Sequence, residues 1–580
     1  MNKPRSKEDL IMKRLIKWVA IICGIFLILI FFSYLIIDSL LDTEPTVSEN
    51  SYVQINLGGS IPEYNPSDPI EEYFEGTSLD LQKIRQSLKM AAIDHRIKGI
   101  ILEVGLLRTG FAKLDEIHQL IEKFQASGKK VYAHFDYGLT NDYYLSSVCD
   151  SIFISPGGTL FLTGAAAEVT FYKGLLNKIG VEADFEHMGE YKNAPDIYTR
   201  QTMSDYQREV IDDILDARYL NLIHTIAQKR HMSPEHVKHL IEEVSGFSPE
   251  DATLQGLVDG IKYIDEVKDL FKGNANKISR ISATDYAFVN PKSVGIRTEK
   301  SIAVIYCTGT MMGGEDGSDP VFGKTMGSDR VIRDIKRAAE NSTIKAIILR
   351  IDSPGGSSLA ADKIWNAVTN ARKAKPVIAS ISDVGASGGY YIALGADTIL
   401  AQNLSLIGSI GVFAGKFSLK NLYDKLDLNK VYMKRGKNAG IFSLNSKFTD
   451  SERKIVQNMI SDFYHKFVTK VAERRKESYD EIDHIARGRV WDGSEGIDIN
   501  LIDKIGGLDE AVEIAKDMAK IEHQTSVRLI YYPKSRSLFN QLFSRFSINS
   551  KLLTNPLEQL EEYFQEIQIK PLFLMPYTIQ

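Results

Sequence analysis

The chain has little cysteine: Cys23, Cys149 and Cys307 are the only three in 580 residues. They lie far apart and match neither a zinc-binding spacing nor the paired cysteines of a disulfide framework. The HExxH pattern of zinc peptidases is also missing. We therefore expect no metal, no cofactor and no disulfide, and we expect Cys149 and Cys307 to be buried as small apolar side chains.

An excess of charge of either sign is missing as well. The formal net charge is -5, and 25% of the residues are charged, as in an ordinary globular protein. Proteins that bind nucleic acid usually present a strongly basic face, so the composition predicts no nucleic-acid partner. At 580 residues the chain is too long for one hydrophobic core, and two or three domains are expected.

Long apolar runs are missing after the first 40 or so residues, but one lies before that point. Residues 18–37 form an apolar run of about 20 residues, long enough to cross a ~30 Å hydrocarbon core as a helix. Basic residues crowd positions 1–17, whereas Asp38 and Asp42 follow the run. The positive-inside rule then places the N-terminus in the cytoplasm and the rest of the chain across the membrane. A cleaved signal peptide is the alternative, but its apolar core is usually only about 7–15 residues long.

The chain is internally duplicated. Ile97–Leu102 resembles Ile344–Leu349, and Leu257–Asp259 resembles Leu501–Asp503. The offset stays between 244 and 247 residues, which is too long for a solenoid repeat and indicates two tandem domains. We assign residues 50–290 to the first repeat, 298–530 to the second and 531–580 to an extension of unknown role. The stretch 273–300, rich in Asn, Ser and Lys, is the predicted linker.

Strand-like and helix-like segments alternate within the second repeat. The predicted strands are Ser301–Tyr306, Ala346–Ile351 and Pro376–Ser382, and the predicted helices between them are Asp329–Ala339 and Ala360–Arg372. This alternation is typical of βαβ units and a largely parallel sheet, so the predicted fold class is α/β. Each repeat also has a long predicted helix in its later half, Asp205–Lys229 and Ser451–Lys476.

A serine among glycines occurs in the second repeat only. Ala386-Ser387-Gly388-Gly389-Tyr390-Tyr391 corresponds to Leu139-Thr140-Asn141-Asp142-Tyr143-Tyr144, which has no serine. Upstream, Ser353-Pro354-Gly355-Gly356 ends a predicted strand, and such a turn can aim two backbone N–H groups at one point, as an oxyanion hole does. Either motif alone is also explained by a glycine-rich turn with positive φ. Their occurrence together in one repeat favours Ser387 as a nucleophile.

A nucleophilic serine needs a base, and the residues leave two kinds open. The pattern G-x-S-x-G also describes α/β-hydrolases, in which an acid and a histidine follow the serine; His465, His484 and His523 do follow it here. The other common base is a lysine whose pKa falls on desolvation. Lys192 lies between a strand-like run and a helix, among small and aromatic residues.

Four motifs, together with the anchor and the duplication, resemble one known family. They are Tyr191-Lys192, Ser353-Pro354-Gly355-Gly356, Ala386-Ser387-Gly388-Gly389-Tyr390 and Gly408-Ser409-Ile410-Gly411. The chain resembles the long, duplicated type of the signal peptide peptidase A family, also called the protease IV type, in peptidase family S49 and the ClpP/crotonase superfamily. The resemblance covers roughly residues 50–530 and implies tandem ClpP/crotonase-like domains behind one transmembrane helix.

The resemblance implies a role for each motif. Ser387 would be the nucleophile, Lys192 the general base and Ser409 the residue that orients the lysine, while the N–H groups of Gly356 and Gly388 would hold the oxyanion. It further implies a homotetramer in the bacterial inner membrane, with the catalytic repeats on the extracytoplasmic side and the anchor in lipid. The implied substrates are hydrophobic peptides, namely cleaved signal peptides.

The chain departs from the family pattern in two places. Gly385 precedes Ala386 where the family more often has alanine, which is a mild change. Lys437 occupies in the second repeat the place that Lys192 holds in the first. In short, unduplicated members the base comes from that place on a neighbouring subunit, so Lys437 is an alternative base.

Two other functions compete with a Ser/Lys peptidase. A crotonase-like acyl-CoA enzyme would use the same oxyanion hole on a thioester, but it typically needs a carboxylate base. A non-catalytic membrane scaffold that binds peptides would need neither Ser387 nor Lys192.

Overall fold

The computed structural model describes residues 45–66, 79–272, 277–319 and 323–534, strand 572–574, and the single positions 17, 18, 21, 24 and 25. The predicted anchor at 18–37 and basic tail at 1–17 therefore lie almost wholly outside the described residues. Within the described part of the chain, no helix combines the length and the apolar character needed to span a bilayer.

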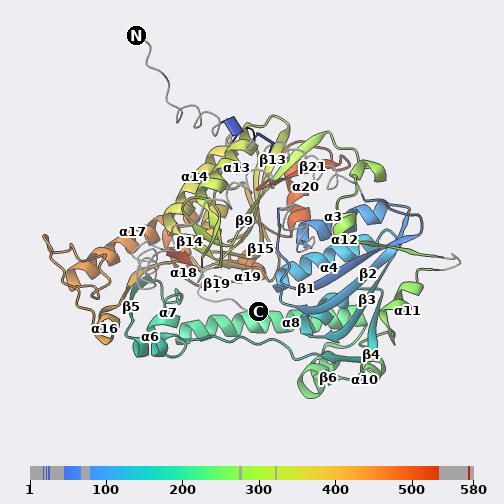
Figure 1. Ribbon diagram of the computed structural model, residues 1–580, viewed down its shortest axis with the longest axis horizontal. Coiled ribbons are helices and arrows are strands. Elements are labelled where there is room, and N and C mark those ends of the chain that lie inside the picture. Colours follow the sequence, from blue (N-terminus) through green and yellow to red (C-terminus); the bar gives the residue numbers. More distant parts are fainter. Residues whose placement is uncertain are drawn as a thin grey trace, which may run out of the picture.

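The first repeat is built on a seven-stranded sheet with the order β6-β4-β3-β2-β1-β8, and β7 pairs with β4. Its central strands are parallel and buried, and they are covered by helices (Figure 1). The strands are β1 Ser51–Gly59, β2 Ile97–Leu107, β3 Lys130–Gly138, β4 Ser151–Phe161, β6 Gly246–Phe247, β7 Gly260–Ile261 and β8 Ser279–Ser282. The helices include α3 Leu81–Ile93, α4 Phe111–Gln125, α5 Thr140–Ser146, α9 Pro234–His239, α10 Pro249–Leu254 and α11 Ile264–Asp269.

The second repeat is built on an eight-stranded sheet with the order β19-β17-β15-β13-β9-β21, beside which β16 and β20 pair. Its central strands read as nearly continuous apolar runs, as expected of parallel strands buried on both faces. The strands are β9 Lys300–Thr308, β13 Ile344–Ser353, β15 Val377–Ala386, β16 Thr398–Ala401, β17 Leu406–Gly408, β19 Val490–Trp491, β20 Lys504–Ile505 and β21 Val527–Tyr532. The helices are α13 Ser328–Glu340, α14 Ser358–Arg372, α15 Gly388–Ala393, α16 Lys420–Lys425, α17 Asp450–Arg475, α18 Tyr479–Ile485, α19 Gly493–Asp498 and α20 Leu508–Met518.

The mixed α/β fold and its duplication are confirmed. The three strands and two helices predicted for the second repeat are β9, β13, β15, α13 and α14, each within a few residues of the predicted bounds. Equivalent hydrogen bonds recur in both copies: the Tyr143 hydroxyl donates to Leu257 O and the Tyr390 hydroxyl to Leu501 O, each at 2.7 Å. The two repeats therefore share packing as well as sequence.

A third sheet joins the two repeats, in the order β11-β12-β10-β14-β22-β18-β5. Strand β5, Glu182–Met188, belongs to the first half of the chain but pairs antiparallel along its whole length with β18, Val412–Ser418. The long helix α8, Asp205–Arg230, runs from this sheet back to the first repeat (Figure 1). The remaining elements of this region are α6 Lys173–Ile179, α7 Asp196–Thr199, β10 Thr310–Met312, β11 Gly317–Asp319, β12 Gly323–Gly327 and β14 Gly355–Ser357.

Two segments are more ordered than the sequence suggests. The described part of the predicted linker contains β8, which pairs with β1, and helix α12, Ala283–Tyr286. The buried side chains of Ile281 and Tyr286 explain this, because they extend the first core beyond the Asn- and Ser-rich composition. Within the predicted extension, β22, Leu572–Leu574, lies between β14 and β18 of the joining sheet. Cys149 and Cys307 are buried and unpaired, as predicted.

Candidate active site

Ser387 lies at a sharp turn between strand β15 and helix α15. Its backbone has φ 55° and ψ -112°, a conformation that L-residues rarely adopt and that costs about 1–3 kcal/mol. The turn is held by hydrogen bonds on both sides: Ser387 N donates to Gly408 O at 2.7 Å, and Tyr391 N donates to Ser387 O at 2.8 Å. The side chain is fully buried. The strained turn thus presents the hydroxyl at the end of a strand, with a glycine immediately after it.

Lys192 reaches this serine from the other half of the chain. It follows β5, so the pairing of β5 with β18 carries it into the second repeat. Lys192 Nζ lies 2.8 Å from Ser387 Oγ, 2.9 Å from Ser409 Oγ and 3.0 Å from Ser409 O. Glycines make room for the lysine, because a Cβ atom at Gly488 would lie 2.5 Å from Lys192 N and one at Gly411 would lie 3.0 Å from its Cδ. The structure therefore brings together Ser387, Lys192 and Ser409.

The surroundings of Lys192 favour the neutral amine. The side chain is fully buried, and this burial lowers its pKa well below the ordinary value of 10.5. A neutral amine has two N–H donors and one lone pair. The two oxygens of Ser409 can accept both donors, which leaves the lone pair directed at the Ser387 hydroxyl. This arrangement can take up the hydroxyl proton when Ser387 attacks an acyl group.

The two glycines of the predicted oxyanion hole lie against each other beside Ser387. A Cβ atom on Gly388 would lie 3.2 Å from Gly356 N and 3.1 Å from Gly355 Cα. Gly356 has φ 151° and packs so closely on Met311 that a Cβ there would lie 2.1 Å from Met311 O. Gly388 opens helix α15, where the first N–H groups have no acceptor within the helix. The two glycines therefore lie close together, as an oxyanion hole formed by their backbone N–H groups requires.

The corresponding loop of the first repeat is filled by a carboxylate. The backbone N–H groups of Leu106 and Leu107, at the end of β2, donate to Asp142 at 3.1 and 2.8 Å. Asp142 lies on α5, which corresponds to α15 of the second repeat. In the first repeat this turn is therefore bound by the protein's own carboxylate, and the residue that this repeat contributes to the site at Ser387 is Lys192.

The other candidate bases lie elsewhere. Lys437 is exposed on the segment between α16 and α17. His465, His484 and His523 are also exposed, and His523 contacts Glu513 and Asp517. Among the described residues, Lys192 is the candidate base whose side chain lies at hydrogen-bond distance from Ser387 Oγ, 2.8 Å away. The geometry thus favours the lysine of the first repeat over both alternatives that the sequence left open.

A group of buried charges beside the site was missed at the level of sequence. Arg350 and Asp352 lie on β13 just before the oxyanion turn, and they contact Glu63, Lys113 and Glu116 of the first repeat. The sequence gives no signal for these contacts, since each partner lies more than 200 residues away.

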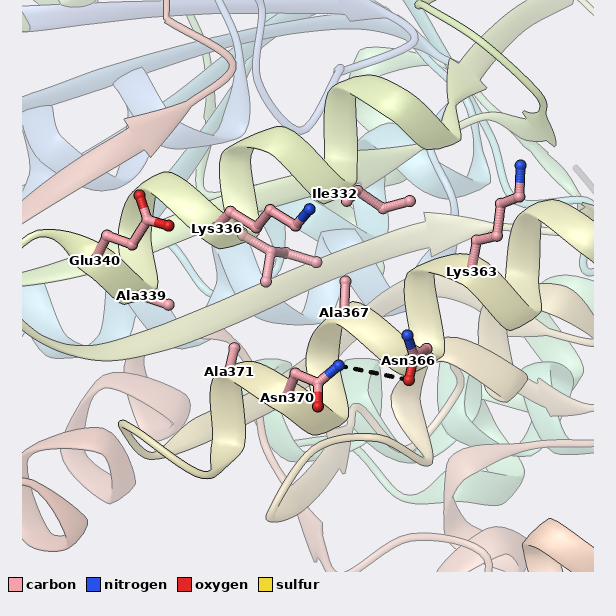
Figure 2. Close-up of a pocket in the computed structure, with 10 residues that line it drawn as sticks. Ile332, Lys336, Ala339, Glu340, Lys363, Asn366, Ala367, Asn370 and Ala371 are labelled. Atoms are coloured by element: carbon pink, nitrogen blue, oxygen red, sulfur yellow. Dashed lines mark hydrogen bonds between the residues drawn. The ribbon is translucent and has the colours of Figure 1, made fainter.

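A groove of about 390 Å³ between α13 and α14 is separate from this site. Figure 2 shows it bordered by Lys336 and Glu340 from one helix and Asn366 and Asn370 from the other. Its walls are outer helix faces, and neither Ser387 nor Lys192 lines it.

A buried serine, an amine at hydrogen-bond distance and two glycine N–H groups form a site suited to acyl transfer through a serine nucleophile. The family model described as peptidase family S49 matches residues 123–277 and 369–522, one segment in each repeat. The chloroplastic serine protease SPPA of Arabidopsis thaliana is 32% identical over 83% of this chain and 71% of its own. Protease 4 of Salmonella typhi is 31% identical over 76% of this chain and 72% of its own, and Protease 4 of Haemophilus influenzae is 29% identical over 76% and 73%.

The chain belongs to peptidase family S49, and its two matched segments give it the long, duplicated SppA type. Membership of this family supports a serine-type protease.

The depressed pKa of Lys192 predicts how activity depends on pH. Only the neutral amine can accept the Ser387 proton, so the rate should rise with pH as Lys192 deprotonates and should level off below pH 10.5. Between the depressed pKa and 10.5 the unfolded chain binds one more proton than the folded one, so the free energy of unfolding should also rise with pH there. A profile of kcat/KM that stays flat from about pH 6 to 9 would argue against a lysine base.

Proposed function

We propose that this chain is a membrane-anchored serine endopeptidase that uses a Ser387/Lys192 dyad to degrade hydrophobic peptides, with cleaved signal peptides as its substrates. The observation that carries the proposal is the contact of 2.8 Å between Lys192 Nζ and Ser387 Oγ in a fully buried site. The group that contacts the serine is an amine, which favours a peptidase over a crotonase-like enzyme with a carboxylate base.

The chemistry follows from these positions. Ser387 Oγ attacks the peptide carbonyl carbon while its proton passes to Lys192 Nζ, and the resulting oxyanion accepts N–H bonds from Gly356 and Gly388. The lysine ammonium then gives that proton to the leaving amine as the C–N bond breaks, which leaves an ester on Ser387. Water attacks the ester while its proton passes to Lys192 Nζ, and the ammonium then gives that proton to Ser387 Oγ as the ester C–O bond breaks, which releases the acid product and restores the serine. Ser409 holds Nζ in place during both steps.

The joining sheet supports a peptide as the substrate. Strand β22 pairs antiparallel with β14, with Phe573 opposite Gly356, and it also pairs with β18. The position between β14 and β18 therefore accepts an extended backbone beside an oxyanion glycine. Binding of a peptide as an added strand satisfies its backbone polar groups and is largely independent of its sequence.

Because β22 occupies this position, removing it should expose the position to other peptides. A chain that ends at residue 570 should show a KM for peptide substrates lowered by roughly 3- to 10-fold, since substrate no longer competes with β22. A chain that ends at residue 574 keeps the strand and is the matched control. The two KM values should be measured with one fluorogenic peptide, and equal values would place substrate elsewhere.

The proposed location is the bacterial inner membrane, with residues 18–37 as a single-pass anchor and both repeats on the extracytoplasmic side. The support is the order of basic residues, apolar run and acidic residues near the N-terminus. Such an anchor confines the enzyme to the membrane in which hydrophobic peptides collect.

We also propose a homo-oligomer, with four subunits as the expected number. Its support is a segment between α16 and α17 with exposed apolar side chains: Val431 is 89% exposed, Met433 85% and Phe442 65%. Clustered apolar side chains of this size on a surface typically mark an interaction site. A second copy of the chain is the proposed occupant.

Hydrolysis of a signal peptide by the detergent-solubilised protein tests the function. We expect cleavage within the hydrophobic segment and little cleavage of a polar peptide of equal length. Binding of the signal peptide without cleavage would favour a scaffold, and turnover of an acyl-CoA thioester would favour the crotonase-like alternative.

A further inference from the structure

Lys113, on helix α4 of the first repeat, contacts two aspartates of the second repeat at once. Its Nζ lies 3.1 Å from Asp352 Oδ2 and 3.3 Å from Asp383 Oδ2, and it donates to Ile61 O at 3.2 Å. Glu63 lies 3.5 Å away. Only 6% of the lysine side chain is exposed, so little solvent screens these contacts.

The two aspartates stand at the bases of the two catalytic turns. Asp352 directly precedes the turn Ser353–Gly356, and Asp383 lies four residues before Ser387. The two segments are also joined directly, because Asp352 Oδ1 accepts from Val384 N at 3.2 Å. The turn continues this bonding: Ser353 Oγ donates to Gly309 O at 2.7 Å and accepts from Gly355 N at 3.2 Å. A shift of either aspartate is thus passed to the oxyanion glycines or to the nucleophile.

Asp383 also caps the helix that carries Lys113. The helix begins after Gly110, which has no side chain to cap it, and Asp383 Oδ1 accepts from Lys113 N at 2.9 Å. A carboxylate at a helix N-terminus is favourable both as a cap and in the field of the helix dipole. Gly110 leaves the space that Asp383 fills, since a Cβ there would lie 2.3 Å from Asp383 Cγ.

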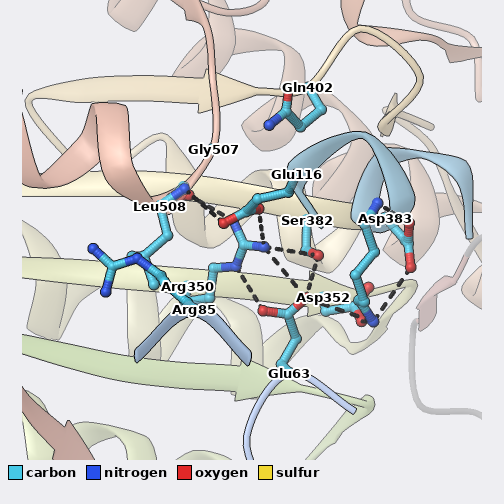
Figure 3. A network of polar contacts seen from close by, with 12 residues as sticks. Glu63, Arg85, Glu116, Arg350, Asp352, Ser382, Asp383, Gln402, Gly507 and Leu508 are labelled. Carbon is cyan, nitrogen blue, oxygen red and sulfur yellow. Dashed lines mark hydrogen bonds and ion pairs between the residues drawn. The ribbon is translucent and has the colours of Figure 1, made fainter. Parts of the chain in front are cut away.

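The same network continues to Arg350, as Figure 3 shows. The Arg350 guanidinium lies between Glu63 at 2.7 Å and Glu116 at 2.6 Å, with Asp352 and Asp383 to one side in the figure. Although burial opposes it, Arg350 and Lys113 hold the pKa of Glu63 at about 2. Burial also disfavours a charged Lys113, yet Asp352, Asp383 and Glu63 raise its pKa above the ordinary value. Lys113 is therefore the cation between three carboxylates.

We propose that Lys113 is a positioning residue, which fixes the oxyanion turn relative to Ser387 by holding Asp352 and Asp383 together from the other repeat. The first repeat thus supplies both the base and the residue that aligns the second repeat's site. The proposal rests on the proposed peptidase function. Without the amine, the contact that joins Asp352 to Asp383 is lost, and the two turns that they support move apart.

The variant Lys113→Met should lower kcat by roughly 100-fold, the effect of a displacement of about 1 Å at a reacting centre. KM should change much less than kcat, because β18, the other strand that pairs with a peptide in this position, makes no contact with Lys113 and stays in place. The pH midpoint of activity should stay unchanged, since Lys192 keeps its surroundings. Lys123 on the same helix is the matched control: it bridges the repeats to Asp509 and Glu510 but is half exposed and far from the turns. Lys123→Met should leave kcat within about twofold.

Gly110→Ala gives an independent test if Lys113→Met fails to fold. It displaces Asp383 and leaves Lys113 in place, and it should lower kcat with KM retained. Lys113→Arg, which keeps the charge, should recover part of the activity. Equal losses in Lys113→Met and Lys123→Met would mean that Lys113 only holds the repeats together, and a loss confined to KM or a shifted pH midpoint would also overturn the proposal. Wild-type protein without turnover on any peptide would instead contradict the proposed function.

Discussion

Replacing Ser387 by alanine should abolish peptide hydrolysis while leaving the fold and the assembly unchanged. The hydroxyl is the only part of the side chain that is lost, and the turn around it is held by backbone hydrogen bonds that alanine retains. Removal of a serine nucleophile lowers kcat by about 10⁴-fold or more in comparable enzymes.

Initial rates on a fluorogenic hydrophobic peptide measure this loss, and size-exclusion chromatography in detergent checks the assembly. Ser301→Ala is the matched control, since Ser301 is a buried serine of the same sheet, on β9. It should keep wild-type activity. Ser387→Ala protein that still cleaves at more than about one hundredth of the wild-type rate would exclude Ser387 as the nucleophile.

Replacing Lys192 by methionine should have the second largest effect, a loss of about 10²- to 10⁴-fold in kcat. Methionine fills the same buried channel but cannot accept the serine proton. It also removes a buried amine whose charged form is disfavoured there, so the free energy of unfolding at neutral pH should rise by roughly 1–4 kcal/mol.

Lys437→Met is the matched control for that experiment. Lys437 corresponds to Lys192 in the duplicated sequence but is exposed, so its replacement should change neither kcat nor Tm appreciably. Loss of activity in Lys437→Met with Lys192→Met still active would move the base to the second repeat. Denaturation midpoints and kcat measured on the same preparations distinguish lost chemistry from lost folding.

The sequence predicts local structure well in the second repeat, because the strands there are short apolar runs between amphipathic helices. It also marks Ser387, since the glycines around it are needed by the backbone itself: a Cβ at Gly389 would lie 2.5 Å from Ser353 O. Functional residues whose position depends on neighbouring residues in the chain, such as Ser387 among its glycines, can therefore be identified from the sequence.

Contacts between the repeats leave no such pattern. The pairing of β5 with β18, which delivers Lys192, depends on the joining sheet and on Arg453, which binds Asp184 at 2.8 Å. From the sequence, Lys192 is favoured over Lys437 only because the motif around it resembles that of the long family type. Lys113 cannot be identified from the sequence for the same reason. Its position on α4 has the pattern of an ordinary surface lysine, and it is buried by the packing of α4 against β15.

The most direct test of a dyad that spans the two repeats is to map a fluorophosphonate label, which bonds covalently to an activated serine. Wild-type, Lys192→Met and Lys437→Met proteins should be labelled in parallel, digested and analysed by mass spectrometry. Our account predicts a label on Ser387 in wild type and in Lys437→Met, and its near absence in Lys192→Met. A label on a different serine, or equal labelling of Ser387 in Lys192→Met, would contradict it.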